Sequence, residues 1–178
     1  VAGGLEKFLS RDGLMCGVCN GFQALVKLGL IPFGKITPPR PSNPTLTFND
    51  ISRHQSKIVR VRVSSNLSPW LNGCEVGQVY SVPVSHGEGK FVADTRALET
   101  MRKNGQIATQ YVDFDGNPSN RVEFNPNGSV WAIEGVTSAD GRIFGKMGHS
   151  ERSGKSLYKN VAGDYDMKIM QSAVEYFK

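Results

Sequence analysis

The sequence predicts an α/β domain with antiparallel additions, built on a mixed and mostly parallel sheet with helices on both faces, and three observations support it. Its 178 residues, 39% of them hydrophobic, are enough for one globular domain with a sizeable core. Near the start, an apolar segment leads into a glycine-flanked turn and then a helix, as in many α/β proteins. Further along, strand-like segments alternate with turn residues before a final helix.

The first elements are indicated by apolar spacing and by the residues that interrupt it. Residues 5–9 have the pattern of the last turns of a helix, which residues 10–13 break. Residues 14–18 form a short apolar strand. The helix expected over residues 20–28 has its apolar residues on one side, and the proline-rich segment 36–44 is expected to be a loop.

The middle of the chain is richer in strand patterns. Valines alternate with arginines over residues 58–63, which indicates a half-buried strand with a solvated basic face. Two turn-rich segments, 113–120 and 125–128, are expected to bound a hairpin. Further strands are expected at 76–84, 107–112, 131–136 and 143–147, and further helices at 95–103 and about 165–177.

The position of the first strand has a consequence for domain organisation. A strand that leads into such a turn belongs in the middle of a parallel sheet, flanked by strands connected through helices. Here only a helix tail precedes it. We therefore expect residues 1–178 to form one domain that is N-terminally incomplete and lacks the first strands of its sheet.

Charge and hydropathy indicate where the chain functions. The formal net charge is +5, but the basic residues are scattered and are not interleaved with aromatic residues, so we expect no nucleic-acid partner. No apolar run approaches about 20 residues, and no signal-peptide pattern is present. We expect no membrane contact and a cytoplasmic location.

The most informative segment is Gly17-Val18-Cys19-Asn20-Gly21. It has the pattern of a nucleophile elbow, a strained strand-to-helix turn that exposes one reactive side chain. Both glycines are expected because backbone segments in the turn approach too closely for a Cβ at either position. A base that converts the Cys19 thiol to a thiolate makes it a nucleophile.

Cys16 and Cys19 also form a C-x-x-C pair, and Cys74 is the third cysteine. A redox role places both cysteines of such a pair at the start of a helix, but Cys16 lies in the apolar strand and is expected to point into the core. A zinc site needs two further ligands, and the sequence contains no second such pair. We therefore expect no metal.

Two segments place a carboxylate two residues after a histidine: His86-Gly87-Glu88 and His149-Ser150-Glu151. In a catalytic triad the histidine must reach the nucleophile, and a carboxylate must hold the imidazole ring in the right tautomer. Chemistry alone leaves the two segments equal as candidates.

The elbow, Gln23 and the late segment 148–152 together resemble the class I glutamine amidotransferases, whose fold is flavodoxin-like. The resemblance implies that Cys19 is the nucleophile, that His149 is the general base and acid, and that Glu151 is the carboxylate that orients the histidine. It thereby favours the second of the two histidine segments as the catalytic one.

The same resemblance concerns two further positions. It implies an oxyanion hole that includes the N–H group of Asn20, with a second donor from a glycine-rich loop that precedes the elbow and lies outside this chain. The family usually has proline where this chain has Ser150, which we expect to face solvent in a turn. The difference is therefore expected to matter little.

Four segments in order resemble the phosphoribosylformylglycinamidine synthase family, in particular the C-terminal amidotransferase domain of its large, fused form. They are residues 17–23, 84–91, 125–129 and 148–152. The resemblance implies that this domain cleaves glutamine through a thioester and supplies ammonia for the ATP-dependent amidation of formylglycinamide ribonucleotide in purine biosynthesis, a ligase reaction. It also implies that glutamine is bound by Gln23, Ser85, His86, Gly87 and Glu88.

The resemblance further implies partners. It places no cofactor in this domain, and ATP and Mg²⁺ in the synthetase part of the parent enzyme. The partner is then a synthetase domain of the same polypeptide or a separate synthetase subunit.

Three alternatives stay open from the sequence. A cysteine hydrolase or peptidase with a related elbow also uses a cysteine and a histidine, but it has no use for a pair of segments that hold glutamine. A catalytically silent fragment that only docks to a synthetase domain is the second alternative, because strands of the domain are expected to be missing. A nucleic-acid binder is supported only by the net charge.

Overall fold

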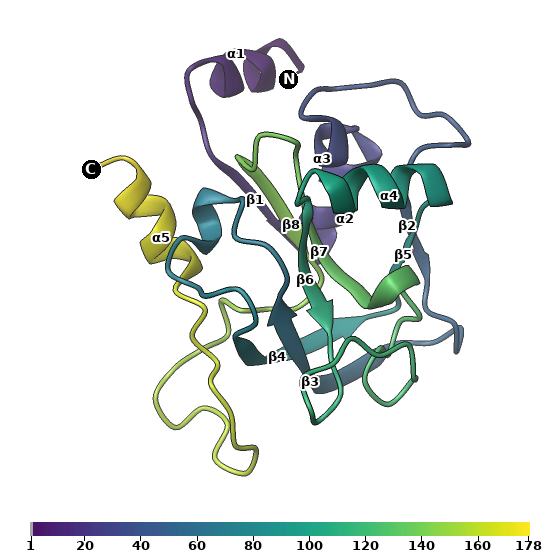
Figure 1. Ribbon diagram of the computed structural model, residues 1–178, viewed down its shortest axis with the longest axis vertical. Helices are drawn as coiled ribbons and strands as arrows, with labels where there is room; N and C mark the ends of the chain where they lie inside the picture. Colours follow the sequence, from purple (N-terminus) through teal and green to yellow (C-terminus); the bar gives the residue numbers. More distant parts are fainter. Residues whose placement is uncertain (1) are drawn as a thin grey trace.

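The computed structural model describes residues 2–178 and contains a six-stranded sheet with helices on both faces (Figure 1). The strand order across it is β1-β8-β7-β6-β3-β4, and β2 pairs with β5 in a separate two-stranded sheet. The strands are β1 (Met15–Val18), β2 (Thr45–Phe48), β3 (Gln55–Val63), β4 (Val79–His86), β5 (Glu88–Val92), β6 (Ile107–Tyr111), β7 (Ile133–Thr137) and β8 (Ile143–Lys146). The helices are α1 (Ala2–Ser10), α2 (Asn20–Lys27), α3 (Leu30–Phe33), α4 (Thr95–Lys103) and α5 (Ile169–Tyr176), with the 3₁₀ helices η1 (Pro69–Leu71) and η2 (Val130–Ala132).

The mixed α/β class is confirmed, but the prediction of a mostly parallel sheet is wrong for the described strands. Only β1 and β8 pair in parallel, whereas β3–β4, β3–β6, β6–β7 and β7–β8 are antiparallel. Parallel neighbours need a long crossover, and a short connection returns the chain antiparallel. The turn between β7 and β8 is of this short kind and includes Gly141 at φ 75°.

Helices cover both faces of the sheet, as expected, and each face has its own apolar core. One core contains Phe22 and Leu25 of α2 together with Met101 of α4. The other contains Ile169 and Ala173 of α5, which lies on the opposite side of the sheet from α4 in Figure 1. No helix in the described part of the chain is long and apolar enough to span a membrane.

Most expected elements are present within a few residues, and the helix expected at 95–103 has those bounds. The pair β2–β5 was missed, because Glu88-Gly89-Lys90 has no apolar alternation and becomes a strand only through pairing with residues 45–48. The expected hairpin near residues 113–128 is wrong: the described residues show only an isolated bridge between Val112 and Pro118.

The basic face of β3 is less solvated than expected. The valines at 59, 61 and 63 are buried as predicted, but Arg60 donates hydrogen bonds to the carbonyl oxygens of Asp113 and Phe114, at 3.2 and 2.5 Å. This arginine is therefore partly used to hold the loop that follows β6.

Candidate active site

Cys19 lies on a strained turn between β1 and α2. Its φ and ψ are 54° and −109°, a conformation that non-glycine residues rarely adopt. Its N–H donates to the carbonyl oxygen of Lys146 at 2.9 Å, which ties the turn to the end of β8. The elbow geometry predicted from the sequence is therefore present.

The two glycines that flank Cys19 are not equivalent. A Cβ at Gly17 would lie 2.6 Å from the backbone carbon of Gly21 and from Cδ1 of Leu25, so position 17 requires glycine. A Cβ at Gly21 would meet nothing within 4 Å. The expectation that both positions exclude a Cβ is confirmed for Gly17 and wrong for Gly21, because only the strand side of the turn is packed against the helix.

The surroundings of Cys19 favour the protonated thiol. Burial raises its pKa above the usual 9.0, and Glu151 adds to this effect. The N–H of Asn20 and the guanidinium of Arg152 act in the opposite direction but do not reverse the shift. The thiol donates a hydrogen bond to the carbonyl oxygen of Ser85, with an S···O distance of 3.9 Å. Attack by this sulfur therefore requires a base that removes the proton during the reaction.

His149 is the residue that the sequence predicts to be that base. It follows β8, which pairs in parallel with β1 in the register Val18–Lys146, so Cys19 and His149 emerge at the same edge of the sheet. The Nδ1 atom of His149 lies 2.6 Å from Oε1 of Glu151. A proton on Nδ1 then leaves Nε2 free to accept one from a thiol.

A cleft of about 420 Å³ opens beside Cys19. It is lined by residues of α2, of the β4–β5 turn and of the segment before β3: Cys19, Asn20, Gln23, His54, Ser85, His86, Gly87 and Glu88. The side-chain amide of Gln23 donates to the carbonyl oxygen of Glu88 at 2.5 Å, which joins α2 to the β4–β5 turn. Every residue predicted to bind glutamine is thus brought to the cleft, and its binding role stays a prediction.

The His86 side chain is held in the protein interior. It is only 4% exposed, and its Nδ1 lies 3.2 Å from Oδ1 of Asn49, whose side-chain nitrogen in turn donates to the His86 carbonyl oxygen. Burial lowers the pKa of His86 from 6.5 to about 4, so the ring is neutral at physiological pH. We therefore expect His86 to shape the β4–β5 turn rather than to exchange protons.

The sequence gives no role in the site to His54, which the structure brings there. It is exposed at the cleft, and its Nε2 lies 3.0 Å from Oγ of Ser85. The antiparallel pairing of Gln55 with His86 carries His54 to this position. No local pattern around residue 54 signals this, since it depends on which strands pair.

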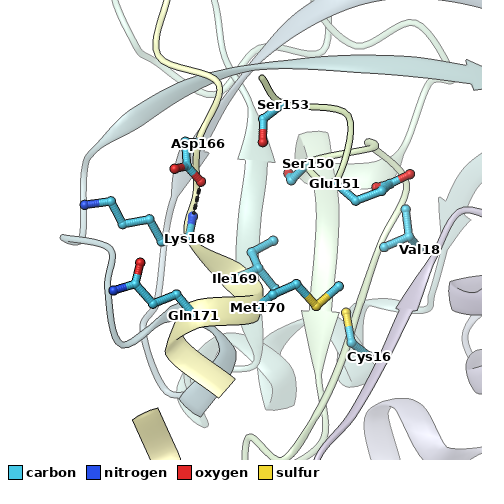
Figure 2. Close-up of a pocket in the computed structure, with 10 residues that line it drawn as sticks. All are labelled: Cys16, Val18, Ser150, Glu151, Ser153, Asp166, Lys168, Ile169, Met170 and Gln171. Carbon is cyan, nitrogen blue, oxygen red and sulfur yellow. Dashed lines mark hydrogen bonds between the residues drawn. The ribbon is translucent and has the colours of Figure 1, made fainter. Parts of the chain in front are cut away.

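A second cavity, of about 290 Å³, has Glu151 among the residues that line it (Figure 2). Cys16 and Met170 line it from β1 and α5. Burial raises the pKa of Cys16 to about 12, so this thiol is a poor nucleophile at neutral pH. Cys16 packs against the core on the α5 face, in agreement with its predicted apolar role.

Ser150 does not face solvent, so that expectation is wrong. The residue is 8% exposed, and its hydroxyl accepts a hydrogen bond from Nζ of Lys146 at 2.8 Å. Its hydroxyl also contacts Sδ of Met167 at 3.0 Å. The turn folds inward here because Ser150 binds the buried ammonium group of Lys146. The local sequence does not reveal that this group is buried.

Comparison with known proteins shows which proteins this chain is similar to. Residues 1–177 match the model of the CobB/CobQ-like glutamine amidotransferase domain. Phosphoribosylformylglycinamidine synthase subunit PurQ of Salinibacter ruber is 36% identical over 96% of this chain and 66% of that protein. The subunit of the same name from Methanococcus maripaludis is 34% identical over 97% of the chain and 69% of that protein.

A solved structure is similar over almost the whole chain. PurLQS from Thermotoga maritima superposes with a TM-score of 0.73 at 28% sequence identity, over 99% of this chain and 68% of the matched one. The chain spans about two thirds of the length of the curated relatives described above.

Proposed function

The chain belongs to the CobB/CobQ-like glutamine amidotransferase family, and on that premise we propose that it releases ammonia from glutamine for phosphoribosylformylglycinamidine synthase. The names of its relatives support this reaction, in which the ammonia converts formylglycinamide ribonucleotide to formylglycinamidine ribonucleotide. The observation that carries the proposal is the pairing of β1 with β8, which places strained Cys19 and the His149–Glu151 pair at one edge of the sheet.

The geometry supports a thioester mechanism. His149 takes the proton from the Cys19 thiol, and the sulfur attacks the side-chain amide carbon of glutamine. The tetrahedral intermediate collapses as His149 gives that proton to the departing nitrogen, so that ammonia leaves and a thioester remains. Water, deprotonated by His149, then adds to the thioester and releases glutamate and the thiol.

In this mechanism the oxyanion of the tetrahedral intermediate forms near the start of α2. The N–H of Asn20 is in the first turn of this helix, where backbone N–H groups have no partner within the helix. This N–H favours negative charge beside it, since it opposes the effect of burial, which raises the pKa of the Cys19 thiol. We assign Asn20 as one donor to the oxyanion, a role for which one lost donor lowers the rate by ~10²–10³.

The partner in this proposal is a synthetase that consumes the ammonia with ATP and Mg²⁺. The relatives are named as subunits, and the solved relative is described as PurLQS. Fusion to the synthetase in one polypeptide stays a prediction of the sequence, as do the cytoplasmic location and the lack of a cofactor in this domain.

The proposal is tested by incubating the protein with glutamine, in the presence and absence of a synthetase partner, and measuring glutamate release. Intact-mass spectrometry of rapidly acid-quenched samples should detect the thioester as an addition to the protein. Cys19→Ser should abolish both signals, whereas the matched control Cys16→Ser should keep them. Release of glutamate by the Cys19→Ser variant would refute the proposal, and cleavage of peptides instead of glutamine would favour the hydrolase alternative.

A further inference from the structure

Glu134 of β7 and Lys146 of β8 form an ion pair in the protein interior. Both side chains are fully buried, and Nζ of Lys146 lies 3.2 Å from Oε1 of Glu134. Removal of two charges from water is unfavourable by several kcal/mol per ion, and it is offset only when the remaining donors and acceptors are also satisfied. The burial of this ion pair therefore requires an explanation.

The surrounding groups satisfy this pair. The ammonium of Lys146 has three N–H donors, and three acceptors surround it: Oε1 of Glu134, the carbonyl oxygen of Gly148 and the hydroxyl of Ser150. Thr109 donates its hydroxyl proton to Oε2 of Glu134. The network is thus complete without water.

Most of these bonds end on the turn that carries His149. The N–H of Gly148 donates to Oε1 of Glu134 at 2.6 Å, and its carbonyl oxygen accepts from Lys146 at 3.0 Å. Both backbone groups of the residue before His149 are therefore held by the pair. The residue after it, Ser150, is held by its side chain at 2.8 Å.

The turn that carries His149 approaches the Glu134–Lys146 ion pair most closely at Gly148. A Cβ at this position would lie 2.9 Å from Oε1 of Glu134, 3.3 Å from Nζ of Lys146 and 2.5 Å from Cγ1 of Val82. Glycine is needed here because the backbone packs directly against Val82 and the buried ion pair.

Lys146 also reaches the other half of the site. Its carbonyl oxygen accepts the N–H of Cys19 at 2.9 Å, so one residue contacts the elbow through its backbone and the His149 turn through its side chain. We infer that Glu134 and Lys146 are positioning residues that fix His149 relative to Cys19. This inference rests on the proposed function, because it assumes that His149 acts on Cys19.

Stability alone does not account for the pair. Replacement of a buried ion pair by apolar residues of similar volume is often neutral or stabilising. By contrast, a displacement of about 1 Å between reacting groups lowers a rate by about 100-fold. The contribution of Glu134 and Lys146 should therefore be found in the rate of the chemical step.

The test is the double variant Glu134→Leu/Lys146→Met, which removes both charges at once. Its matched control is Glu99→Leu/Arg102→Met, which removes an exposed ion pair from α4 with an N···O distance of 2.9 Å. We expect the first variant to fold, to form the thioester about 10- to 100-fold more slowly and to keep the KM for glutamine within about twofold. The control should match the wild type in folding, in the rate of thioester formation and in the KM for glutamine.

A second readout does not involve glutamine. The rate of Cys19 alkylation by iodoacetamide is measured against pH for the wild type, for His149→Ala and for the interior double variant. We expect the profile of the double variant to move toward that of His149→Ala. A folded double variant with wild-type thioester formation and a wild-type alkylation profile would overturn the inference.

Two further comparisons keep the test decisive. If the double variant does not fold, Ser150→Ala removes one acceptor of Lys146 and should slow the chemical step about tenfold, whereas Ser150→Thr should restore it. A wild-type rate for Ser150→Ala would then count against the inference. If the wild type does not cleave glutamine at all, the proposed function fails, and the alkylation profiles still decide whether the pair positions His149.

Discussion

The N–H of Cys19 donates a hydrogen bond to the carbonyl oxygen of Lys146 at 2.9 Å. This bond continues the parallel pairing of β1 and β8 by one residue beyond the end of β1. The elbow and the turn that carries His149 are consequently parts of one hydrogen-bonded unit. The position of Cys19 relative to His149 is then set by the pairing of β1 with β8.

Cys19 should be the only one of the three cysteines that reacts with an electrophilic analogue of glutamine. Cys16 has a pKa of about 12 and Cys74 is only 4% exposed, whereas Cys19 opens onto the cleft. Peptide mass spectrometry after labelling reads this directly, with Cys19→Ser as the control. Labelling of Cys16 in the folded wild type would contradict the assignment.

The alanine variants of His149 and His54 should differ in which kinetic constant they change. His149→Ala should lower the rate of thioester formation by ~10²–10⁴, because the base is lost. His54 contacts the hydroxyl of Ser85 rather than a carboxylate, so His54→Ala should mainly raise the KM for glutamine. Single-turnover and steady-state kinetics separate the two effects, and the reverse pattern would exchange the roles.

Alanine substitution at the two glycines of the elbow should change the stability of the protein in opposite directions. Gly17→Ala introduces contacts of 2.6 Å with Gly21 and Leu25, which we expect to destabilise the fold by about 1–3 kcal/mol. Gly21→Ala meets open space and lies in α2, where alanine favours the helix by up to about 1 kcal/mol. Urea unfolding of both variants measures the difference. Equal destabilisation by the two substitutions would show that the packing is not as described.

The stability of the protein should decrease in mild acid because of His86. Burial, with smaller contributions from His54 and His149, lowers the pKa of His86 from 6.5 to about 4, while Glu134 acts in the opposite direction. Below pH 6.5 the unfolded chain takes up a proton that the folded protein accepts only near pH 4. The stabilisation present above pH 6.5 is therefore lost between these values, by up to about 3 kcal/mol.

Urea unfolding at several pH values checks this expectation. His86→Asn should reduce the loss of stability between neutral pH and about pH 4.5, although it also disturbs the bonds to Asn49. His54→Ala, at an exposed position, is the control and should keep most of the wild-type dependence. An unchanged dependence in His86→Asn would assign the effect to other groups.

Local sequence determined the elbow and the pairing of His149 with Glu151. The Gly-x-Cys-x-Gly pattern is enough to predict a strained turn, because only a few residues and their backbone angles are involved. The pairing of His149 with Glu151 is likewise local, since the two residues are two apart. The helix at residues 95–103 follows from its own apolar spacing and its Asp94 cap.

Tertiary structure decided everything that depends on which strands become neighbours. The antiparallel pairing of most of the sheet, the strand β5 and the place of His54 beside Cys19 all arise from contacts between distant segments. The same is true of Ser150, which turns inward to a lysine that is buried only because Glu134 is buried beside it. Periodicity reports the environment of one segment at a time, so a network that joins β7, β8 and the His149 turn leaves no signal in any of them.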